Sequence, residues 1–423
     1  MASVAVRLPS STAAPAASAT ELNGATSRPR ALTSCAPSAL LPRQSLTLRA
    51  KPAQRKTKSR VCSARPAITA SAASAPEYLE ALLDAPPAVA RQEVTAFAPA
   101  TVANLGPGFD FLGCAVEGLG DHVTARILDV PAPPSGNIII ERIEGDNGRL
   151  GFDPATNCIG IAARATMELL GLYGPDGKGS GTPTKSGSNL PVIGLTLNKG
   201  LPLGSGLGSS AASAAAAAVA VNALFGSPLS KAQLVLAGLQ SEAAVSGYHA
   251  DNVAPGLMGG FVLVRSYRPL HLIPLTFGEG KKLFFVVVTP AFEAPTKEMR
   301  AALPKEITMA SHVANSSQAA ALIHAIHTGD ARLLGAALAS DTIVEPRRSP
   351  LIPGMSAVKV AAKAAGAHGC TISGAGPTAV AVVDSEEVGR AVGAAMVEAF
   401  QEQGKLHAKA TVAALDSVGG RVV

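Results

Sequence analysis

The chain has 423 residues, of which 47% are hydrophobic and 16% are charged. This composition is typical of a globular protein with a large core and room for two domains, and it excludes a wholly disordered or fibrous chain. The net charge of +6 comes from residues 1–76, which hold eleven Lys or Arg and a single acid, Glu21. Because the remainder has 25 basic and 29 acidic residues, the basic pI gives no support for nucleic-acid binding, and no nucleic-acid partner is expected.

Residues 1–76 are rich in Ser, Ala, Pro and Thr and lack the single apolar core of a secretory signal. An Arg- and Ser-rich segment with almost no acid is typical of an organelle transit peptide. Since Ser, Thr and Ala dominate over an amphipathic arginine helix, we expect targeting to the chloroplast (the plastid stroma), with cleavage between about Arg60 and Ser74. A plain disordered extension is the alternative.

Three cysteines follow this segment: Cys114, Cys158 and Cys370. An odd number with no C-x-x-C argues against a disulfide framework and against structural zinc, and predicts reduced, mostly buried thiols. No apolar run reaches the length of a membrane span, so no membrane association is expected.

From about Glu77 the chain alternates strands and helices. The periodicity predicts strands at 94–102, 122–130, 137–143, 191–197 and 256–264, and helices at 158–170, from the alanine run to about Phe225, and at 230–245. Residues 265–280, with their Pro and Gly, are a plausible joint between domains at 77–270 and 271–423.

The strand at 191–197 leads into a glycine-rich loop, Pro202-Leu-Gly-Ser-Gly-Leu-Gly-Ser-Ser210, and then into the alanine-rich helix. The first amides of a helix have no internal partners and lie at the positive end of its dipole. Glycines in front of them let backbone N–H groups close on a phosphate without a Cβ in the way. The segment therefore predicts a strand, an anion-binding loop and a helix in succession.

Two common glycine signatures do not fit this loop. The dinucleotide fingerprint requires a third glycine where Ser209 stands, which makes a dehydrogenase the weakest alternative. The Walker loop requires a lysine directly after the glycines, and none follows. An ordinary flexible loop capped by Ser209 or Ser210 is the structural alternative. If phosphates bind here, we expect their charge to be balanced by a metal ion and by helix amides.

The second half predicts a smaller α+β unit. Its expected elements are strands at 283–289, 370–373, 378–383 and 408–415 and helices at 296–303, 312–327, 331–339, from about Met355, and at 385–401. The ending suggests helices on one face of a sheet, and no internal repeat of fixed period is present. The predicted fold class is α+β.

Polar residues that a core would exclude are dense at 100–110, 242–255, 295–300 and 344–353. The hydroxyl of Ser210 and the carboxylate of Glu242 are ligand types that Mg²⁺ prefers. Asp251 is suited to accept a proton from an attacking hydroxyl or to orient it. Arg300 and Arg348 suit a bidentate grip on a carboxylate.

The same segments hold groups suited to bind an ammonium ion, namely Asn104, Asp110 and His249. Each candidate has a structural alternative. The first two are typical of a Gly-Pro-Gly turn, the histidine of a satisfied loop, and the charged residues of a solvated surface. Together with the glycine loop, however, they form a complete set for phosphoryl transfer.

The segment Pro202–Ala212 resembles the phosphate loop of the GHMP kinases, and within that superfamily the chain is most similar to the homoserine kinases. The resemblance covers the chain in order from about Val94 to the C-terminus. It rests on Thr101–Asp110, Ser246–Pro255, Thr296–Arg300, Glu345–Arg348 and Ser373–Pro377. The loop alone is specific only to the superfamily, whereas the motifs together are specific to the family.

This resemblance implies a two-domain GHMP kinase fold, with an N-terminal ATP-binding domain like ribosomal protein S5 domain 2 and a ferredoxin-like C-terminal domain. It implies ATP-dependent transfer of the γ-phosphate to the side-chain hydroxyl of L-homoserine, giving O-phospho-L-homoserine for threonine biosynthesis and its methionine branch. It also implies a homodimer.

The resemblance further assigns roles to single residues. Ser210 and Glu242 would attend Mg²⁺ and, with Asp251, form the catalytic group. The amino acid would be bound by Asn104, Asp110, His249, Asp251, Arg300, Arg348 and Gly374. The nucleotide would be bound by Pro202, Leu203, Gly204, Ser205, Gly206, Leu207, Gly208, Ser209, Ser210, Ala211 and Ala212, with Asn157 near the adenine.

The residues themselves favour homoserine, which offers a carboxylate, an ammonium group and a hydroxyl. Mevalonate has no ammonium group, and the lysine and Gly-Glu-His of the mevalonate kinase N-terminal motif do not stand here. Asp251 remains either a base or an ammonium anchor, because an insertion separates it from Ser246-Gly247. A plastid isoprenoid-pathway kinase and a catalytically inactive sensor of an amino acid or nucleotide are the alternatives.

Overall fold

The computed structural model describes residues 82–133, 136–173, 190–245 and 247–423. The predicted transit segment, residues 1–76, therefore lies outside the described residues. Within the described part, strands and helices alternate and form two sheets, each with its own helices. The α+β class predicted from the sequence is confirmed.

The larger sheet has seven strands among the described residues. Its path is β11 (Arg421–Val422), β1 (Glu93–Ala103), β2 (Leu112–Leu128), β4 (Val192–Asn198) and β3 (Ile138–Glu144), with the hairpin β5 (Phe261–Tyr267) and β6 (Leu270–Leu275) attached to β2. Strands β3 and β4 are parallel, and the other neighbours are antiparallel. The C-terminal strand β11 thus pairs with the first strand, a contact that the sequence did not predict.

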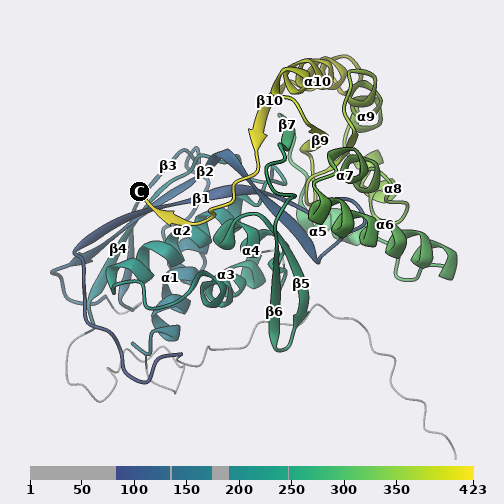
Figure 1. The fold of residues 1–423 in the computed structure, drawn as a ribbon. Helices are drawn as coiled ribbons and strands as arrows, with labels where there is room; N and C mark the ends of the chain where they lie inside the picture. Colours follow the sequence, from purple (N-terminus) through teal and green to yellow (C-terminus); the bar gives the residue numbers. More distant parts are fainter. Residues whose placement is uncertain (1–81, 134–135, 174–189, 246) are drawn as a thin grey trace, which may run out of the picture. The chain divides into compact units, whose positions relative to one another are not determined.

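Four helices cover one face of this sheet: α1 (Cys158–Leu169), α2 (Ser209–Leu224), α3 (Lys231–Val245) and α4 (Ala250–Met258) (Figure 1). Helix α2 is the central one, since it packs on β1 and β2 and also on α1, α3 and α4. Every residue of α2 except Ser210 is buried. Its alanine run allows this crowding, because small side chains let neighbouring backbones approach closely.

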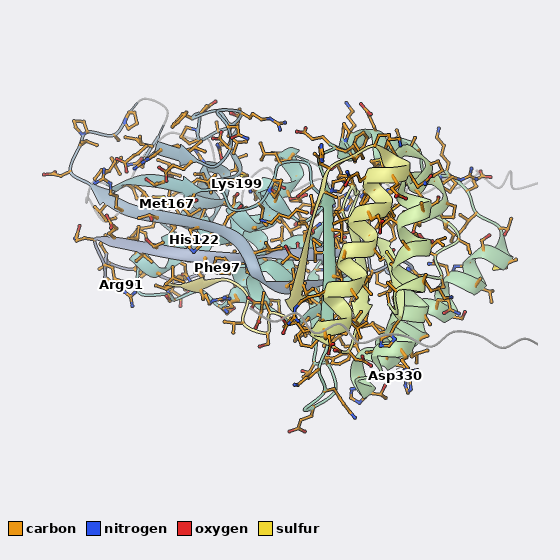
Figure 2. The ribbon with its side chains drawn as sticks, turned by 90° about the horizontal axis from the view of Figure 1, so that it is seen from above. Arg91, Phe97, His122, Met167, Lys199 and Asp330 are labelled. Carbon is orange, nitrogen blue, oxygen red and sulfur yellow. The ribbon has the colours of Figure 1, made fainter. Side chains whose placement is uncertain are left out.

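The opposite face of the larger sheet carries polar and aromatic side chains. Phe97 and His122 lie side by side there, with ring centroids 5.0 Å apart (Figure 2). The residues next to Phe97 in β1, Ala96 and Ala98, point to the helical side and are fully buried. This alternation is the period-2 pattern of a sheet with one buried face.

The smaller sheet runs β10 (Ala408–Ala414), β7 (Phe284–Pro290), β9 (Ala379–Val383) and β8 (Gly369–Ile372), with antiparallel neighbours throughout. Helices α9 (Met355–Ala364) and α10 (Glu386–Ala399) pack on one face, and α6 (Met309–Thr328) and α7 (Ala331–Leu338) border the other (Figure 1). Short helices α5 (Thr296–Ala301) and α8 (Glu345–Arg348) lie in the connections.

A hydrophobic cluster joins the two sheets. It combines Leu112 and Phe261 from the larger sheet with Phe285 of β7 and Leu334 and Leu338 of α7. All five side chains are fully buried. The cavity described below is lined by residues from both the larger-sheet and the smaller-sheet side.

Three expectations about elements differ from the structure. The strand expected at 256–264 begins only at Phe261, because residues 250–258 form helix α4. Pro255 lies inside α4 and has no N–H to donate to the carbonyl of Asp251. That oxygen packs against Gly113, where an added Cβ would lie 1.9 Å from it.

The joint expected at 265–280 is also different in the structure. It contains the end of β5 and all of β6, which pair as an antiparallel hairpin. The other difference is in β2, which starts at Leu112 and not near His122. The domain boundary at 270/271 falls at the start of β6 and stays a prediction.

Candidate active site

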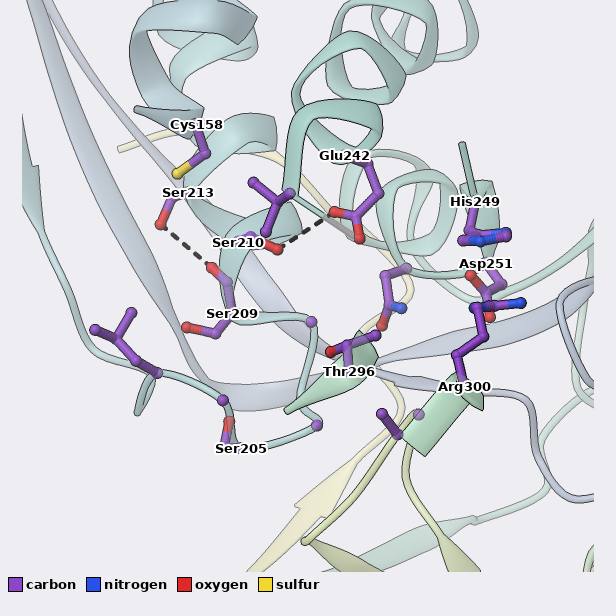
Figure 3. A pocket seen from close by; sticks show the side chains of 18 of the residues that line it. Cys158, Ser205, Ser209, Ser210, Ser213, Glu242, His249, Asp251, Thr296 and Arg300 are labelled. Atoms are coloured by element: carbon purple, nitrogen blue, oxygen red, sulfur yellow. Dashed lines mark hydrogen bonds between the residues drawn. The ribbon is translucent and has the colours of Figure 1, made fainter. Parts of the chain in front are cut away.

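A cavity of about 350 Å³ lies where the glycine loop meets the polar segments singled out from the sequence. Figure 3 shows side chains from several helices directed into this space, with Ser210 and Glu242 at one end and His249, Asp251 and Arg300 at the other. Segments more than 200 residues apart in sequence, such as Asn104 and Arg348, line the same cavity. The structure thus brings these motifs to one cavity, while the roles predicted for their residues stay predictions.

The glycine loop presents backbone to the cavity. Gly204, Gly206 and Gly208 have φ values of +64°, +80° and +64°, a region that favours glycine. A Cβ at Gly206 would lie 2.6 Å from the carbonyl oxygens of both Ser373 and Gly376, and one at Gly208 would lie 2.0 Å from the hydroxyl of Thr101. At Gly206 and Gly208 the loop is therefore packed so closely that a Cβ would not fit.

Helix α2 begins directly after this loop. Its N-cap is Gly208, and no side chain caps its first amides. The expectation that Ser209 or Ser210 caps the helix is thus not met. A long helix whose first N–H groups have no side-chain partner offers a site for an anion.

A buried ion pair supports the loop from below. The ammonium group of Lys199 contacts the carboxylate of Asp121 and donates to the hydroxyl of Ser213 at 2.9 Å and to the carbonyl of Ser209 at 2.6 Å. The other carboxylate oxygen of Asp121 accepts from the amides of Gly200 and Leu201 at 2.9 and 3.0 Å. This network fixes both the start of the loop and the start of α2.

Lys199 also lines the cavity, although only 1% of its side chain is exposed. The glycine loop thus has a lysine before its glycines, although it has none after them. Because the charge of Lys199 is paired with Asp121, the expectation that a metal ion and helix amides balance phosphate charge stays a prediction. A lysine that ends a strand directly before a glycine is the sequence signal that would have pointed to it.

Two acidic residues, Glu242 of α3 and Asp251 of α4, line the cavity together with Ser210. The hydroxyl of Ser210 donates to the carboxylate of Glu242 at 3.3 Å (Figure 3). Asp251 stands in the first turn of α4 and is 3% exposed. Burial, and then the nearby carboxylates of Asp110 and Glu242, raise its pKa to about 8. At neutral pH this carboxyl group is therefore mostly protonated.

Asp110 and Arg300 form a bidentate ion pair across the other end. The two guanidinium nitrogens donate to the two carboxylate oxygens at 3.0 and 2.8 Å. Burial alone would lower the pKa of Arg300, but the hydrogen-bonded Asp110 outweighs it and the pKa is raised. The Nδ1 of His249 lies 3.9 Å from Asp110, and burial lowers the pKa of this imidazole.

Two polar atoms at this end have no hydrogen-bond partner among the described residues. They are the Nε of Arg300 and the Nε2 of His249, and both are buried. Buried polar groups are almost always paired. Two orphaned polar atoms on residues that line one cavity therefore indicate the place of a polar ligand.

Arg348 approaches the same space from α8. It is 2% exposed, donates to the carbonyls of Gly374 at 2.9 Å and of Met299 at 3.3 Å, and lies over the ring of Phe109. Burial, and then the charge of Arg300, lower its pKa to about 10. Two arginines at one end of a cavity make that end strongly attractive to a carboxylate.

Asn104 has a structural role that the sequence left open. Its side chain donates to the carbonyl of Gly374 at 2.9 Å and accepts from the amide of Asp110 at 3.0 Å. It therefore holds the turn that presents Asp110 and ties this turn to the smaller-sheet side. Asn157 similarly caps α1, accepting from the amide of Ile159 at 3.1 Å while lining the cavity.

Not every predicted site residue reaches the cavity. Leu207, Ala211 and Ala212 are buried in the hydrophobic core, and Pro202 is exposed outside the lining. The remaining predicted residues line it: Asn104, Asp110, Asn157, Leu203, Gly204, Ser205, Gly206, Gly208, Ser209, Ser210, Glu242, His249, Asp251, Arg300, Arg348 and Gly374. The nucleotide-binding roles expected for these four residues stay predictions, and the residues lie outside the lining of this cavity.

The lining also contains residues that the sequence did not single out as site residues: Lys199, Phe109, Arg149 and Thr296. Thr296 begins α5 in a segment that was noted as polar. Phe109 stands between Asn104 and Asp110, where aromatic character alone gave no functional signal. The guanidinium groups of Arg300 and Arg348 both lie over its ring, with the guanidinium carbons 5.3 Å and 5.1 Å from the ring centroid.

The fold and the loop together define the class of protein. A family model described as GHMP kinases N terminal domain matches residues 179–260, and one described as GHMP kinases C terminal matches residues 322–413. These matches cover the glycine loop with α2 to α4 and most of the smaller-sheet unit.

Comparison with single proteins narrows the class. A homoserine kinase from Arabidopsis thaliana is 62% identical over 330 residues, which is 78% of this chain and 84% of that protein. One from Chlorobaculum tepidum is 41% identical over 332 residues, covering 78% of this chain and 98% of the relative. The crystal structure of homoserine kinase from Cytophaga hutchinsonii matches with a TM-score of 0.70 and 38% identity, covering 79% of this chain and 98% of that chain. The chain belongs to the homoserine kinase family of the GHMP kinases.

Proposed function

We propose that the protein phosphorylates the side-chain hydroxyl of L-homoserine with ATP and releases O-phospho-L-homoserine and ADP, a reaction of threonine biosynthesis. The observation that carries this proposal is the two-ended cavity. An uncapped helix start and a glycine loop lie at one end, and paired arginines with acidic groups lie at the other. A phosphoryl donor and an amino-acid acceptor fit these ends separately.

The loop end is suited to the phosphate chain of ATP. Backbone amides of the loop and of the first turn of α2 supply donors, and Lys199, which is paired with Asp121, holds the start of α2 through the carbonyl of Ser209. Such preorganised donors stabilise charge on the transferred phosphoryl group without reorganising during the reaction.

Ser210 and Glu242 are suited to hold a magnesium ion. The hydroxyl and the carboxylate lie 3.3 Å apart at the edge of the loop, and Mg²⁺ takes a small number of protein oxygens beside water and phosphate oxygens. When bound, the ion would neutralise charge on the phosphates.

The amino-acid end is suited to a zwitterion. Arg348 and Arg300 offer guanidinium groups to the carboxylate, and Asp110 offers a carboxylate to the ammonium group. The orphaned Nε–H of Arg300 is a further donor toward the substrate, and the orphaned Nε2 of His249 is a further polar atom for it. Mevalonate, which lacks the ammonium group, would leave Asp110 without a new partner.

Asp251 is influenced by acids from both ends of the cavity, because the charges of Asp110 and Glu242 both raise its pKa. In the proposed reaction the homoserine oxygen attacks the γ-phosphorus, the bond from that phosphorus to the bridging oxygen breaks, and ADP leaves. The hydroxyl proton passes to the Asp251 carboxylate. A pKa of about 8 makes Asp251 a competent acceptor once it is ionised.

A coupled assay of ADP release tests this function. With L-homoserine as the only acceptor, we expect turnover that depends on both substrates. A panel with D-homoserine, L-serine, mevalonate and no acceptor serves as the control. Turnover with mevalonate but not with L-homoserine would assign the protein to the isoprenoid alternative, and nucleotide binding with no turnover on any acceptor would assign it to the sensor alternative.

We also propose that residues 1–76 are a chloroplast transit peptide. The composition of the segment and its position ahead of β1 support this. Import of the radiolabelled full chain into isolated chloroplasts should yield a shorter, protease-protected product cut between about Arg60 and Ser74. Uptake by mitochondria alone, or no uptake, would contradict the proposal.

Two further proposals concern assembly. We propose a homodimer, which the family resemblance implies, and a domain boundary near residue 270, which the Pro and Gly of residues 265–280 favour. Light scattering of the purified protein measures the mass of the assembly, and a value equal to one chain would reject the dimer. Limited proteolysis near residues 265–280 tests the boundary.

A further inference from the structure

An ion pair beside the glycine loop joins the two halves of the cavity. Arg149 lies in the connection between β3 and α1, and Glu293 lies in the connection between β7 and α5. Both guanidinium nitrogens of Arg149 contact the Glu293 carboxylate, the second pair of atoms at 3.0 Å. The contact is therefore bidentate, and it links a segment of the larger-sheet side to one of the smaller-sheet side.

The pair lies directly at the loop. Arg149 lines the same cavity as Gly204, Ser205 and Gly206. A Cβ placed on Gly204 would be 3.7 Å from the side-chain carbons of Glu293 and 3.8 Å from one of its carboxylate oxygens. A negative carboxylate thus stands next to the end of the loop that is suited to phosphate, and Arg149 is the residue that neutralises it.

The backbone that carries Arg149 is fixed in place. The carboxylate of Asp146 accepts from the amides of Gly148 at 3.1 Å and Leu150 at 2.8 Å, so it clasps both neighbours of Arg149. These backbone donors lower the pKa of Asp146. The guanidinium therefore starts from a defined position at the edge of the cavity, which limits the entropy lost when it binds a ligand.

The other cations of the lining are already committed. Lys199 is 1% exposed and bonded to Asp121, Ser213 and a carbonyl. Arg300 is held by Asp110, and Arg348 is buried on carbonyl groups at the amino-acid end. Among the described residues of the lining, Arg149 is thus the cation at the loop end with a half-exposed side chain, 50% accessible.

The partner of Arg149 is easily exchanged. The side chain of Glu293 is 53% exposed, and ion pairs in such surroundings are weak. A phosphate group also accepts a bidentate contact from a guanidinium group, and it carries more charge than a carboxylate. Exchanging the carboxylate for a phosphate group therefore costs little and gains a stronger hydrogen-bonded pair.

We propose that Arg149 is a phosphate-binding residue of the nucleotide site, and that Glu293 holds its guanidinium beside the loop until the phosphate chain of the nucleotide replaces the carboxylate. This inference rests on the proposed use of ATP. Arg149 would then supply what the glycine loop and Lys199 do not, namely a cation that moves to the phosphates from the side of the cavity.

A purely structural tether makes a different prediction. If the ion pair only ties the two sides together, removing either partner breaks the same contact, and both variants change nucleotide affinity in the same direction. If Arg149 moves to the phosphates, the two variants act in opposite directions. Arg149→Ala loses a ligand, whereas Glu293→Gln removes the competitor for that ligand.

Calorimetric titration of the full chain with ADP, without homoserine, measures this directly. We expect Arg149→Ala to weaken ADP binding by about 10-fold to 100-fold, and Arg149→Lys to recover part of the loss. Glu293→Gln should leave ADP binding unchanged or tighten it by up to about 5-fold. Arg390→Ala, which breaks the exposed pair with Glu386 on α10, is the matched control and should change nothing.

Adenosine identifies the part of the nucleotide that Arg149 contacts. The loss in Arg149→Ala should be absent for adenosine, because adenosine has no phosphate. Equal weakening in Arg149→Ala and Glu293→Gln, unchanged ADP binding in Arg149→Ala, or an equal loss for adenosine would each overturn the inference. If the wild-type protein binds no ADP at all, it is the proposed function that fails.

Discussion

Asp251 is the side chain whose surroundings depart furthest from those of an ordinary carboxyl group in this site. It is 3% exposed and stands near two other acids, and its pKa is raised to about 8. A group in that position destabilises the folded protein when it is ionised, and such strain is common at functional sites. Two predictions follow from this single residue.

The first concerns stability. In the unfolded chain Asp251 ionises near pH 4, so between about pH 4 and pH 8 the folded state holds a proton that the unfolded state has lost. The contribution of Asp251 to stability therefore falls as pH rises through this range and levels off above it. Asp251→Asn should raise Tm by several degrees at pH 8 and much less at pH 4.5.

Thermal unfolding at the two pH values measures this difference. Glu387→Gln, which changes an exposed carboxyl group on α10, is the control and should show no such pH dependence. A variant at position 251 that is less stable than the wild type at pH 8 would contradict the stated cause of the pKa shift.

The second prediction concerns turnover. If Asp251 accepts the hydroxyl proton, kcat/KM should rise with pH toward about 8 in the wild type, and Asp251→Asn should lower kcat by about 100-fold or more. Positioning and electrostatics carry much of phosphoryl transfer, so some activity should remain. If the variant keeps kcat at saturating homoserine and loses only affinity, Asp251 is an ammonium anchor and not a base.

At the scale of elements, the glycine loop and the start of α2 act as one unit. The loop is held from below by Lys199 and Asp121, and from the side by Ser373, whose hydroxyl donates to the carbonyl of Gly206 at 2.7 Å. Its glycines therefore serve different purposes. Gly204 needs only a positive φ, whereas Gly206 also needs the space that a Cβ would take.

This difference gives a matched pair of variants. Gly204→Ala should cost about 1 kcal/mol, because its Cβ would meet nothing closer than 3.7 Å. Gly206→Ala should cost more, about 2–4 kcal/mol, and weaken ATP binding at least about 10-fold, because two carbonyl groups must move. Chemical denaturation and nucleotide titration measure both; equal effects of the two variants would contradict the packing described for Gly206.

The elements also show what the sequence can predict. Strands such as β1, β4 and β9 were predicted well, because their apolar periods are long and their burial is simple. Helix α4 was not, because Pro255 and Gly256 are local signals for a break, and only the packing of α4 on β2 overrides them. Lys199 was missed for a similar reason: its partner Asp121 is 78 residues away, and no local pattern joins the two.

The candidate site was predicted more completely than the fold, because short motifs carry its chemistry. The sequence named the groups at both ends of the cavity. It could not show that Asp110 and Arg300 bind each other, or that Asn104 bonds to Gly374, since these contacts depend on how two sheets meet. The same limit explains why Arg149 was passed over, as its importance depends on Glu293 from the other side.

At the scale of the whole described structure, the two sheets share a core and a hydrogen-bonded seam. The amide of Gly374 donates to the carbonyl of Ala103 at 3.2 Å, and the amide of Thr378 donates to that of Ser205 at 3.2 Å. Leu338 of α7 is fully buried in the shared cluster. The two units should therefore unfold together.

Differential scanning calorimetry tests this cooperativity. We expect one transition in the wild type, and Leu338→Ala should lower its free energy of unfolding by about 2–5 kcal/mol without splitting it. Val360→Ala, at an exposed position of α9, is the control and should have little effect. Two resolved transitions in the wild type would show that the units unfold independently.

The identity of the phosphorylated product tests the central claim most directly. After reaction of the protein with ATP and L-homoserine, phosphorus NMR and mass spectrometry should show one phosphomonoester on the side-chain oxygen of homoserine for each ADP formed. Formation of ADP with inorganic phosphate alone, or of a phosphate on the carboxyl or amino group, would contradict the arrangement in which arginines hold the carboxylate and the hydroxyl faces the loop.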